Sequence, residues 1–408
     1  MTENPHLRPI DFQLVYHQGQ QMWYLRDPLQ LTPHQLIMPP ALAQMLIFCD
    51  GTRTPEEIHA AFCEHVGQAV DYDIIADALH HLNQACLLDN ERTRQTQADL
   101  LTEYHNAPCR PPALADLSYP ADPDTLTALF QEYEKGDDLS DWQPWQGRGI
   151  ISPHIDYQRG GSVYAKTWRR AETAVSEADL VIIFGTDHNG GGGTITLTRQ
   201  AYATPYGTLP ADLALVDNLA AVIGEEAAYA EELHHIKEHS VELSAVWLHY
   251  TTQRLGLKPK PMVPILCGSF HHFMANKEHP GKDARLTAVI DTLQRETAGK
   301  KVLVVASVDF AHVGPSFGDS FNMDAARRAA LKTSDKNLMN AIAQGSAADF
   351  FHQIAAIQDR HRICGFSSIY LMLRYLESVS DGLTVAYDHC PADAENNSLV
   401  SIGGMLLK

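Results

Sequence analysis

Short runs of apolar residues alternate with stretches of helical periodicity throughout residues 147–408. Continuous β-branched runs separated by helices are typical of a parallel sheet that is covered by helices on both faces. We therefore predict an α/β domain over 147–408, with a central, largely parallel sheet flanked by helices. The runs that predict its strands are RGIISPHIDY, DLVIIFGTDH, KPMVPILCGS, KKVLVVASVDFAH, LTVAYDHC and SLVSIGGMLL.

The pattern differs in the first 95 residues. The segment VYHQGQQMWYLRDP alternates around a glycine and predicts a short hairpin. Thr54, Pro55 and Glu57 have the spacing of a helix start with a capping box, and a further helix is predicted in DIIADALHHLNQACLLD. We predict a small α+β domain over 1–95. Proline clusters and acidic runs then predict a linker over 96–146.

Polar residues follow three of the predicted strands where each strand ends. Ligands of open α/β sheets bind beyond the carboxyl ends of the strands, so these residues predict a site. Each strand end carries a histidine with a nearby aspartate, and the first also carries a tyrosine: His154 with Asp156 and Tyr157, His188 with Asp187, and His312 with Asp309. A phosphate cradle at Gly190–Gly193 is disfavoured, because the run lacks the Lys and Ser/Thr of a P-loop.

Two further segments add candidate ligands. KEHSVE opens a helix-like stretch and contributes His239 and two carboxylates, of which Glu242 is a candidate for substrate contact. Cys364 precedes a predicted helix, whose dipole would lower the pKa of the thiol and favour thiolate. Thiolate and neutral imidazole are natural ligands of late first-row metals.

Composition narrows the function. The chain has 31 Lys and Arg against 50 Asp and Glu, a net charge of −19, which argues against a general nucleic-acid or anionic membrane surface. No apolar run approaches the roughly 18 residues of a membrane span, and the N-terminus lacks signal-peptide features, so we expect a cytoplasmic protein. Seven scattered cysteines without a CxxC pair predict free thiols.

The motifs at the strand ends together resemble the Memo family, protein B of the AmmeMemoRadiSam system. Six segments occur in the family order across about residues 147–408: SPHIDYQRGGSVYA, GTDHNG, TPYGTLPAD, EHSVE, SVDFAHVG and ICGFSSIY. The resemblance implies a fold related to class III extradiol dioxygenases, with a redox-active metal at the site.

By motif, the resemblance places the metal ligands on His154, His188 and Cys364. Acid/base positions are assigned in the same way to His239, Asp309 and His312, with Asp187 beside the ligand. The first motif departs from the family by carrying Asp156, so a site of two histidines and a carboxylate remains an alternative; Asp156, Tyr157 and Glu242 are the candidates for substrate contact. Fe(II) is the metal that we favour, with copper or zinc as alternatives.

The N-terminal segment LIFCDGTRTPEEIHAAF, together with ALHHLNQACLL, is similar to winged-helix domains of the PqqD type. Those domains bind leader peptides by strand addition at a hairpin edge, so a peptide is a candidate partner of residues 1–95. Dimerisation or docking is the alternative. DNA binding is disfavoured, because residues 1–95 carry few Lys and Arg and many acids.

Three functions fit these features. The first is a mononuclear iron or copper enzyme with redox or dioxygenase-like chemistry, which the association in the family name connects to a radical-SAM protein and an AMMECR-type protein. The second is a zinc-dependent hydrolase with the same ligands. The third is a non-enzymatic module that binds a peptide or protein partner.

Overall fold

A computed structural model describes residues 4–408, which form two compact units that divide after Ala107. The helix α4 (Glu91–Asn106) belongs to the first unit and runs into the segment that we predicted as a linker. In the same segment, α5 (Pro123–Glu134) buries Leu126 and Phe130 in a core of the second unit. The segment between the predicted domains is therefore divided between the two units.

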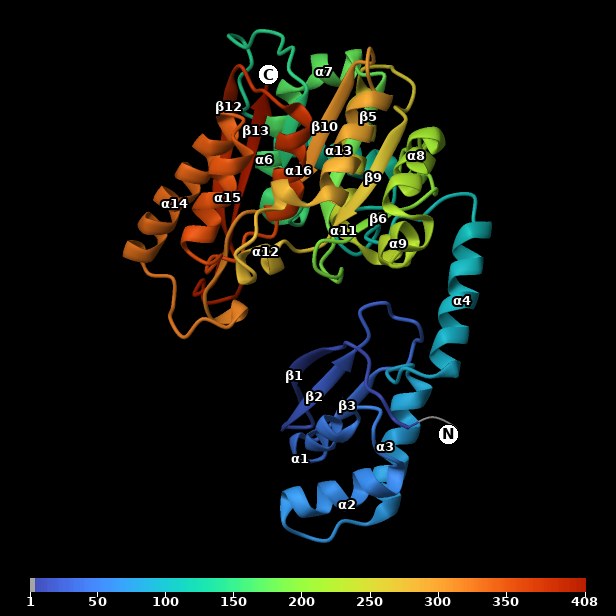
Figure 1. Ribbon diagram of the computed structural model, residues 1–408. Helices are drawn as coiled ribbons and strands as arrows, with labels where there is room; N and C mark the ends of the chain where they lie inside the picture. The colour runs from blue at the N-terminus through green and yellow to red at the C-terminus, as the bar shows by residue number, and fades with distance from the viewer. Residues whose placement is uncertain (1–3) are drawn as a thin grey trace. The chain divides into compact units, whose positions relative to one another are not determined.

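The first unit contains a three-stranded antiparallel sheet. The predicted hairpin is confirmed: β1 (Asp11–His17) pairs with β2 (Gln20–Arg26) in regular register. Its two turn residues, Gln18 and Gly19, have φ of 49° and 79°, which are the positive angles of a type I′ turn. The short β3 (Leu36–Met38) pairs with the other side of β2, so β1 is an edge strand (Figure 1).

Helices complete the first unit. The predicted capping box is confirmed at α2 (Pro55–Val66), where the Glu57 amide donates to Thr54 Oγ1 and the Thr54 amide donates to the Glu57 carboxylate. The remaining helices are α1 (Pro40–Ala43), the 3-10 helix η1 (Gln44–Phe48) and α3 (Tyr72–Gln84). Their apolar faces meet in one core around Ile58, Phe62, Ile75, Leu79 and Leu82.

Eight strands of the second unit form one sheet: β4 (Gly149–Ser152), β5 (Leu180–Thr186), β6 (Ile195–Leu197), β9 (Met262–Cys267), β10 (Val302–Ser307), β11 (His312–Val313), β12 (Gly382–Pro391) and β13 (Leu399–Leu407). Each of the six predicted runs contributes a strand, namely β4, β5, β9, β10, β12 and β13, whereas β6 lies in none of these runs. The strand order is β11-β13-β4-β10-β5-β9-β6, with β12 paired to β13. The four central strands are parallel and the outer ones antiparallel. The predicted α/β fold is confirmed.

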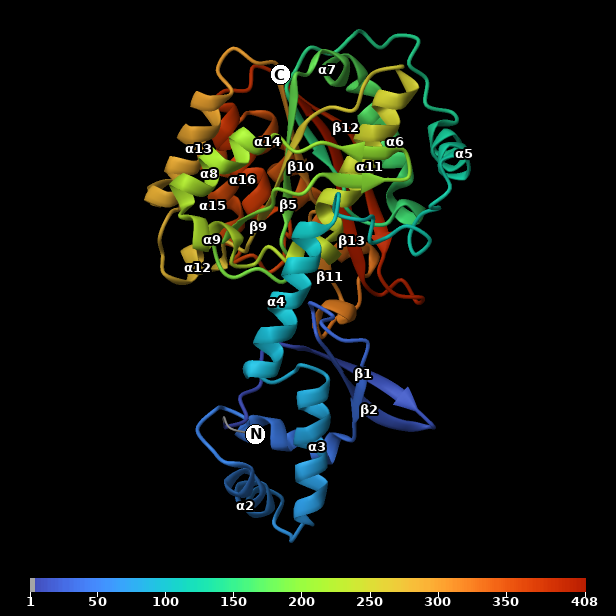
Figure 2. The ribbon, with the colours of Figure 1, turned by 90° about the vertical axis from the view of Figure 1, so that its right-hand side faces the viewer.

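Alternation along the strands separates two helical layers. On β5, Leu180, Ile182 and Phe184 face one core, whereas Val181 and Ile183 face the other. Figure 2 shows the sheet between these layers. One layer consists of α8 (Leu213–Ile223), α13 (Ala284–Glu296), α14 (Ala325–Ala343), α15 (Ala347–Ala356) and α16 (Phe366–Leu376). The other consists of α5, α6 (Tyr157–Arg170), α7 (Glu172–Glu177) and α11 (His239–Arg254).

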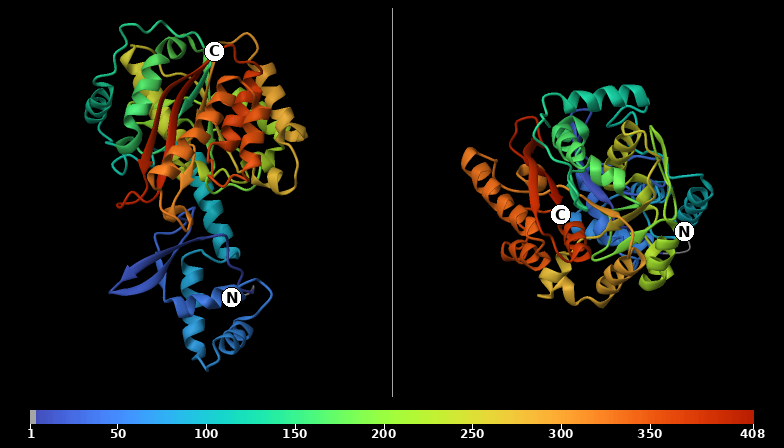
Figure 3. Two further views of the ribbon diagram at one scale, coloured as in Figure 1. Left: turned by 90° about the vertical axis from the view of Figure 1, so that its left-hand side faces the viewer. Right: turned by 90° about the horizontal axis from the view of Figure 1, so that it is seen from above.

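Figure 3 shows β12 and β13 between the two helical layers. Several smaller elements lie outside these layers. The smaller elements are α9 (Glu225–Tyr229), α10 (His234–Lys237), α12 (His271–Ala275), the hairpin of β7 (Tyr202–Thr204) and β8 (Gly207–Leu209), and the 3-10 helices η2 (Pro280–Lys282) and η3 (Pro315–Phe317). Among residues 4–408, no helix is both long and apolar enough to cross a bilayer.

Candidate metal centre

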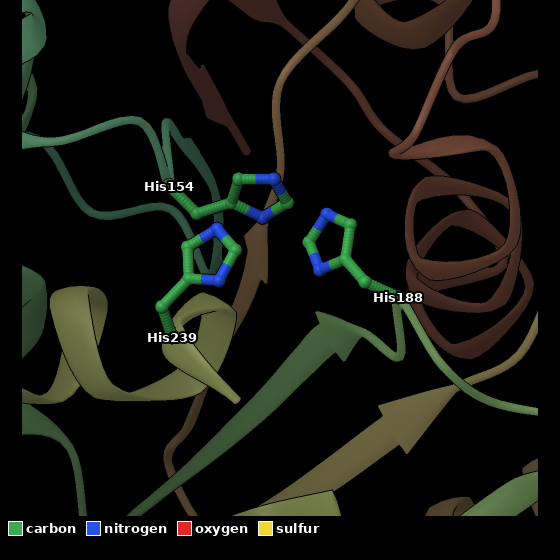
Figure 4. Close-up of side chains that lie close together, drawn as sticks. All are labelled: His154, His188 and His239. Carbon is green, nitrogen blue, oxygen red and sulfur yellow. The ribbon is translucent and has the colours of Figure 1, made fainter. Parts of the chain in front are cut away.

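Three imidazoles converge at the carboxyl ends of the parallel strands. His154 follows β4, His188 follows β5 and His239 is the first residue of α11. Their ring centroids lie 4.7–5.1 Å apart, and one nitrogen of each ring lies within 4.8 Å of the other two. Figure 4 shows the three rings turned toward one another.

One nitrogen of each ring is occupied by an acceptor. His154 Nδ1 lies 3.0 Å from the Ser307 carbonyl oxygen, and the Nδ1 atoms of His188 and His239 each lie 3.1 Å from a Glu238 carboxylate oxygen. A proton on each Nδ1 satisfies these acceptors, and Nε2 is then the nitrogen that each ring can offer to a metal ion. This is the arrangement in which outer carboxylates and carbonyls orient the histidines of metal sites.

Glu238 organises two of the three histidines. It is buried and is the N-cap of α11, where it accepts the amides of His239 at 2.8 Å and Ser240 at 2.9 Å. It also accepts the His188 amide at 3.1 Å. Glu238 was not among the predicted site residues; the sequence signal for it is a carboxylate in the capping position directly before His239.

Charge and burial set the protonation of this group. Burial, followed by the charges of His188 and His239, lowers the pKa of His154, so that imidazole is neutral. Desolvation alone would lower the pKa of His188, but Glu238 and Cys364 outweigh it and raise that pKa. Burial also opposes ionisation of Glu238, yet the two neighbouring imidazoles hold its pKa well below the usual value. Glu238 is therefore a carboxylate.

A glycine allows α11 to approach the end of β5. A Cβ added at Gly185 would lie 2.6 Å from Ser240 Oγ and 2.7 Å from Val241 Cγ2. The close approach lets Ser240 Oγ donate to the Thr186 carbonyl at 2.8 Å. Gly185 thus sets the spacing that brings His239 next to His188.

We expect Gly185→Ala to lower the free energy of unfolding by about 1–3 kcal/mol, because the added methyl overpacks a closed contact. Denaturant titration measures the loss. The matched variant Val241→Ala removes one clashing methyl, so the double variant should be less destabilised than the sum of the single variants. Strictly additive losses would contradict this account.

Cys364 reaches the same centre. Its Sγ lies 3.3 Å from His154 Nε2 and 3.3 Å from the Asp309 carbonyl oxygen. Two ligands bound to one ion at roughly 2.0–2.3 Å lie at about this separation, so the thiol is close enough to share an ion with His154. The group of ligand atoms within 4.8 Å of one another nevertheless contains the three histidines without Cys364. The expected lowering of its pKa by a helix dipole is not found: α16 begins only at Phe366, and burial raises the pKa of Cys364.

Asp309 and His312 line a cleft of about 460 Å³ beside the three histidines. Asp309 Oδ1 accepts the amides of His154 at 3.0 Å and Ile155 at 3.2 Å, while its Oδ2 lies 3.8 Å from His154 Nε2. Burial raises the pKa of Asp309 to about 6 and lowers the pKa of His312 to about 4. A second hollow of about 330 Å³ shares His188, His312 and Phe317 with the cleft.

Two predicted substrate contacts lie elsewhere. Glu242 is buried in an ion pair with Arg110 and also accepts the Tyr119 hydroxyl. Tyr157 is fully buried and its hydroxyl donates to the Leu243 carbonyl oxygen at 2.7 Å. Neither residue lines the cleft. The predicted placement of Glu242 and Tyr157 is therefore corrected: both are core residues that anchor α11. Arg110, the partner of Glu242, was not among the predicted site residues.

The two remaining candidates differ in their surroundings. Asp156 lines the cleft, where it caps α6 and pairs with Arg159 at 2.7 Å. The Asp187 carboxylate is buried and accepts from His234 Nδ1 at 2.9 Å. Asp187, Glu231 and His234 form a second close group of potential metal ligands. Glu231 also accepts the Gly191 amide at 3.1 Å, so the glycine run contacts a carboxylate of the chain itself.

The fold and the site define an α/β protein with a histidine-rich candidate metal centre at the carboxyl ends of its parallel strands. Residues 110–406 match the family described as Memo-like protein, and the chain belongs to this family.

Relatives named as MEMO1 family proteins differ in how much of the chain they share. The protein from Aquifex aeolicus is 26% identical over 384 residues and covers 94% of this chain and 95% of its own length. That span extends into the first unit, because the second holds only residues 108–408. The Archaeoglobus fulgidus protein is 25% identical over 303 residues, with 99% of its own length matched by 73% of this chain. The relatives therefore differ in how much of the first unit their matches can include.

Other matches are shorter or weaker. The Methanopyrus kandleri relative is 31% identical over 215 residues, which cover 50% of this chain and 70% of that protein. Among solved structures, an uncharacterized protein from Escherichia coli K12 gives a TM-score of 0.35 at 14% identity, covering 64% of this chain and 100% of its own. The family assignment does not depend on that structure.

Proposed function

We propose that His154, His188 and His239 bind one late first-row metal ion through their Nε2 atoms. The observation that carries the proposal is that each Nδ1 faces an acceptor, while one nitrogen of each ring lies within 4.8 Å of one nitrogen of the other two rings. A cation between the rings satisfies the lone pairs of three deprotonated Nε2 atoms, and binding at His188, whose pKa is raised, would displace a proton. The donor set therefore fits such an ion.

Access to the centre supports catalysis rather than a purely structural role. The side chains of His188 and His239 are 35% and 37% exposed and border the cleft, whereas structural metal sites are closed. An iron or copper ion bound here would supply Lewis acidity and electron transfer to a substrate in the cleft. We favour Fe(II), with the Cys364 thiol beside the ion, and infer an oxidoreductase.

Two residues of the chain can handle protons in the cleft. The pKa of Asp309, about 6, lets its Oδ2 hold or release a proton near neutral pH. His312 is neutral because burial lowers its pKa to about 4. Its Nδ1 faces the carbonyl oxygens of Phe310 and Arg362 at 3.2 Å, which leaves Nε2 as a hydrogen-bond acceptor. Asp309 is thus the proposed acid/base, and His312 the proposed acceptor.

A second function, a zinc-dependent hydrolase, is favoured by the number of imidazoles. Three histidine ligands with an open position are a known catalytic zinc set. The same residues would then orient a water molecule instead of a redox substrate. Reconstitution with one metal at a time separates the two functions: oxygen uptake restored by Fe(II) favours the oxidoreductase, and ester or peptide hydrolysis restored only by Zn²⁺ favours the hydrolase.

Metal content of protein purified without oxygen tests the centre. We expect about one iron or copper ion per chain in the wild type, since the donor set holds one ion, and background levels in His154→Ala/His239→Ala. The matched control His80→Ala removes an exposed histidine of the first unit and should keep the metal. Cys364→Ser separates the ligand sets, because retained metal favours three imidazoles and lost metal favours the thiolate. Wild-type protein that binds no iron, copper or zinc would overturn the proposal.

A further inference from the structure

We propose that β1 pairs antiparallel with β1 of a second copy of this chain, so that two three-stranded sheets join across a two-fold axis at Leu14. The proposal is independent of the metal centre. It rests on the open edge of the hairpin, its exposed apolar side chains and the symmetry of its sequence.

The outer edge of β1 is open to pairing. Within residues 4–408, β1 pairs only with β2. Proline, lysine and β-bulges usually protect an edge strand against association. β1 is seven residues long, DFQLVYH, and contains none of them. The opposite edge differs, because β3 has only three residues and is followed directly by Pro39.

Apolar side chains stand exposed along one face of β1. Phe12, Leu14 and Tyr16 are 48%, 45% and 75% exposed, and their spacing of two residues places them on the same face of the strand. Their cross-strand neighbours on β2 include Leu25, which is in the core of the first unit. The core face of the sheet therefore continues outward onto β1 without a cover, and a second sheet that extends it would bury these side chains.

The backbone of the same three residues points outward. In a two-residue hairpin, the pair next to the turn, His17 and Gln20, exchanges hydrogen bonds, and the alternation continues along the strand. The amides and carbonyls of Phe12, Leu14 and Tyr16 then face away from β2. These outward groups are spaced symmetrically about Leu14. A two-fold axis at Leu14 therefore places each outward amide opposite a carbonyl oxygen of the second copy.

The side chains agree with the same register. An antiparallel pair centred on Leu14 places Asp11 opposite the partner's His17, where an imidazole can donate to the carboxylate. It places Phe12 opposite the partner's Tyr16, an aromatic pair of the kind that stabilises adjacent strands. No like charges meet in this register. The edge is thus complementary to itself, which fits a second copy as the occupant through an isologous interface.

The mass of the full chain in solution tests the dimer. We expect light scattering or sedimentation to give a mass that rises with concentration toward twice the chain's 45.2 kDa. Leu14→Lys places two ammonium groups at the axis and should raise the dissociation constant about tenfold or more. The control Gln20→Lys adds the same charge beside the turn and should leave the mass unchanged. A monomer at every concentration, or a dimer that persists in Leu14→Lys, would overturn the proposal.

Two further variants test the register. Asp11→Lys should weaken the dimer, and Asp11→Lys/His17→Asp should restore it, because the exchanged charges meet again across the axis. Residues of a hydrogen-bonded antiparallel pair lie about 5.5 Å apart at Cα, within disulfide range. Leu14→Cys should therefore cross-link two chains under oxidation, whereas Gln20→Cys and the wild type should not. Failure of the charge exchange and the cross-link together would exclude this register.

Discussion

Replacing Glu242 with alanine should lower the free energy of unfolding by about 3–5 kcal/mol, the largest loss that we expect from a single substitution. The side chains of Glu242 and Arg110 are 1% and 0% exposed. Removing the carboxylate leaves the guanidinium buried without its counter-charge, and Tyr119 also loses its acceptor. Denaturant titration of the full chain measures this loss.

The control for this prediction is an exposed ion pair of the same unit. Glu177 and Lys301 pair at 3.0 Å with side chains 44% and 66% exposed, so Glu177→Ala should cost at most about 1 kcal/mol. A double variant, Arg110→Met/Glu242→Leu, should recover much of the loss, because it removes both buried charges. A Glu242→Ala protein as stable as Glu177→Ala would show that the buried pair contributes little.

Glu238→Gln should weaken metal binding by about 10–100-fold, the usual cost of losing a carboxylate that orients metal-binding histidines. The glutamine keeps an oxygen that can cap α11. It cannot accept from both imidazoles as a carboxylate does, so the Nδ1 protons of His188 and His239 lose their common anchor. Competition with a chelator of known affinity measures the change for Co²⁺, Zn²⁺ or Fe²⁺.

The matched control here is Glu226→Gln, which neutralises an exposed carboxylate on α9. It should leave metal affinity unchanged and thus account for the general loss of negative charge. A thermal melt without metal then separates orientation from folding, because Glu238 also holds the first amides of α11. Equal affinities in Glu238→Gln and the wild type would contradict the orienting role of Glu238.

Local patterns predicted much of the fold. Each apolar run became a strand because strands buried on both faces must be apolar along their whole length, and the alternation on β5 divides its side chains between two cores. The capping box at Thr54 and Glu57 and the hairpin of β1 and β2 depend on neighbouring residues, so they were also visible in the sequence. The division at Ala107 was not visible, because it depends on how α4 and α5 pack.

For the site, the sequence determined which strand ends carry histidines, and parallel strands necessarily bring those ends to one edge of the sheet. The tertiary structure alone decided the role of each carboxylate. Glu238 and Glu242 lie four positions apart, yet one orients two imidazoles and the other pairs with Arg110, 132 positions away along the chain. Burial likewise outweighed the local effect of a helix on Cys364. Partners and burial arise from contacts between distant segments, and a local pattern does not encode them.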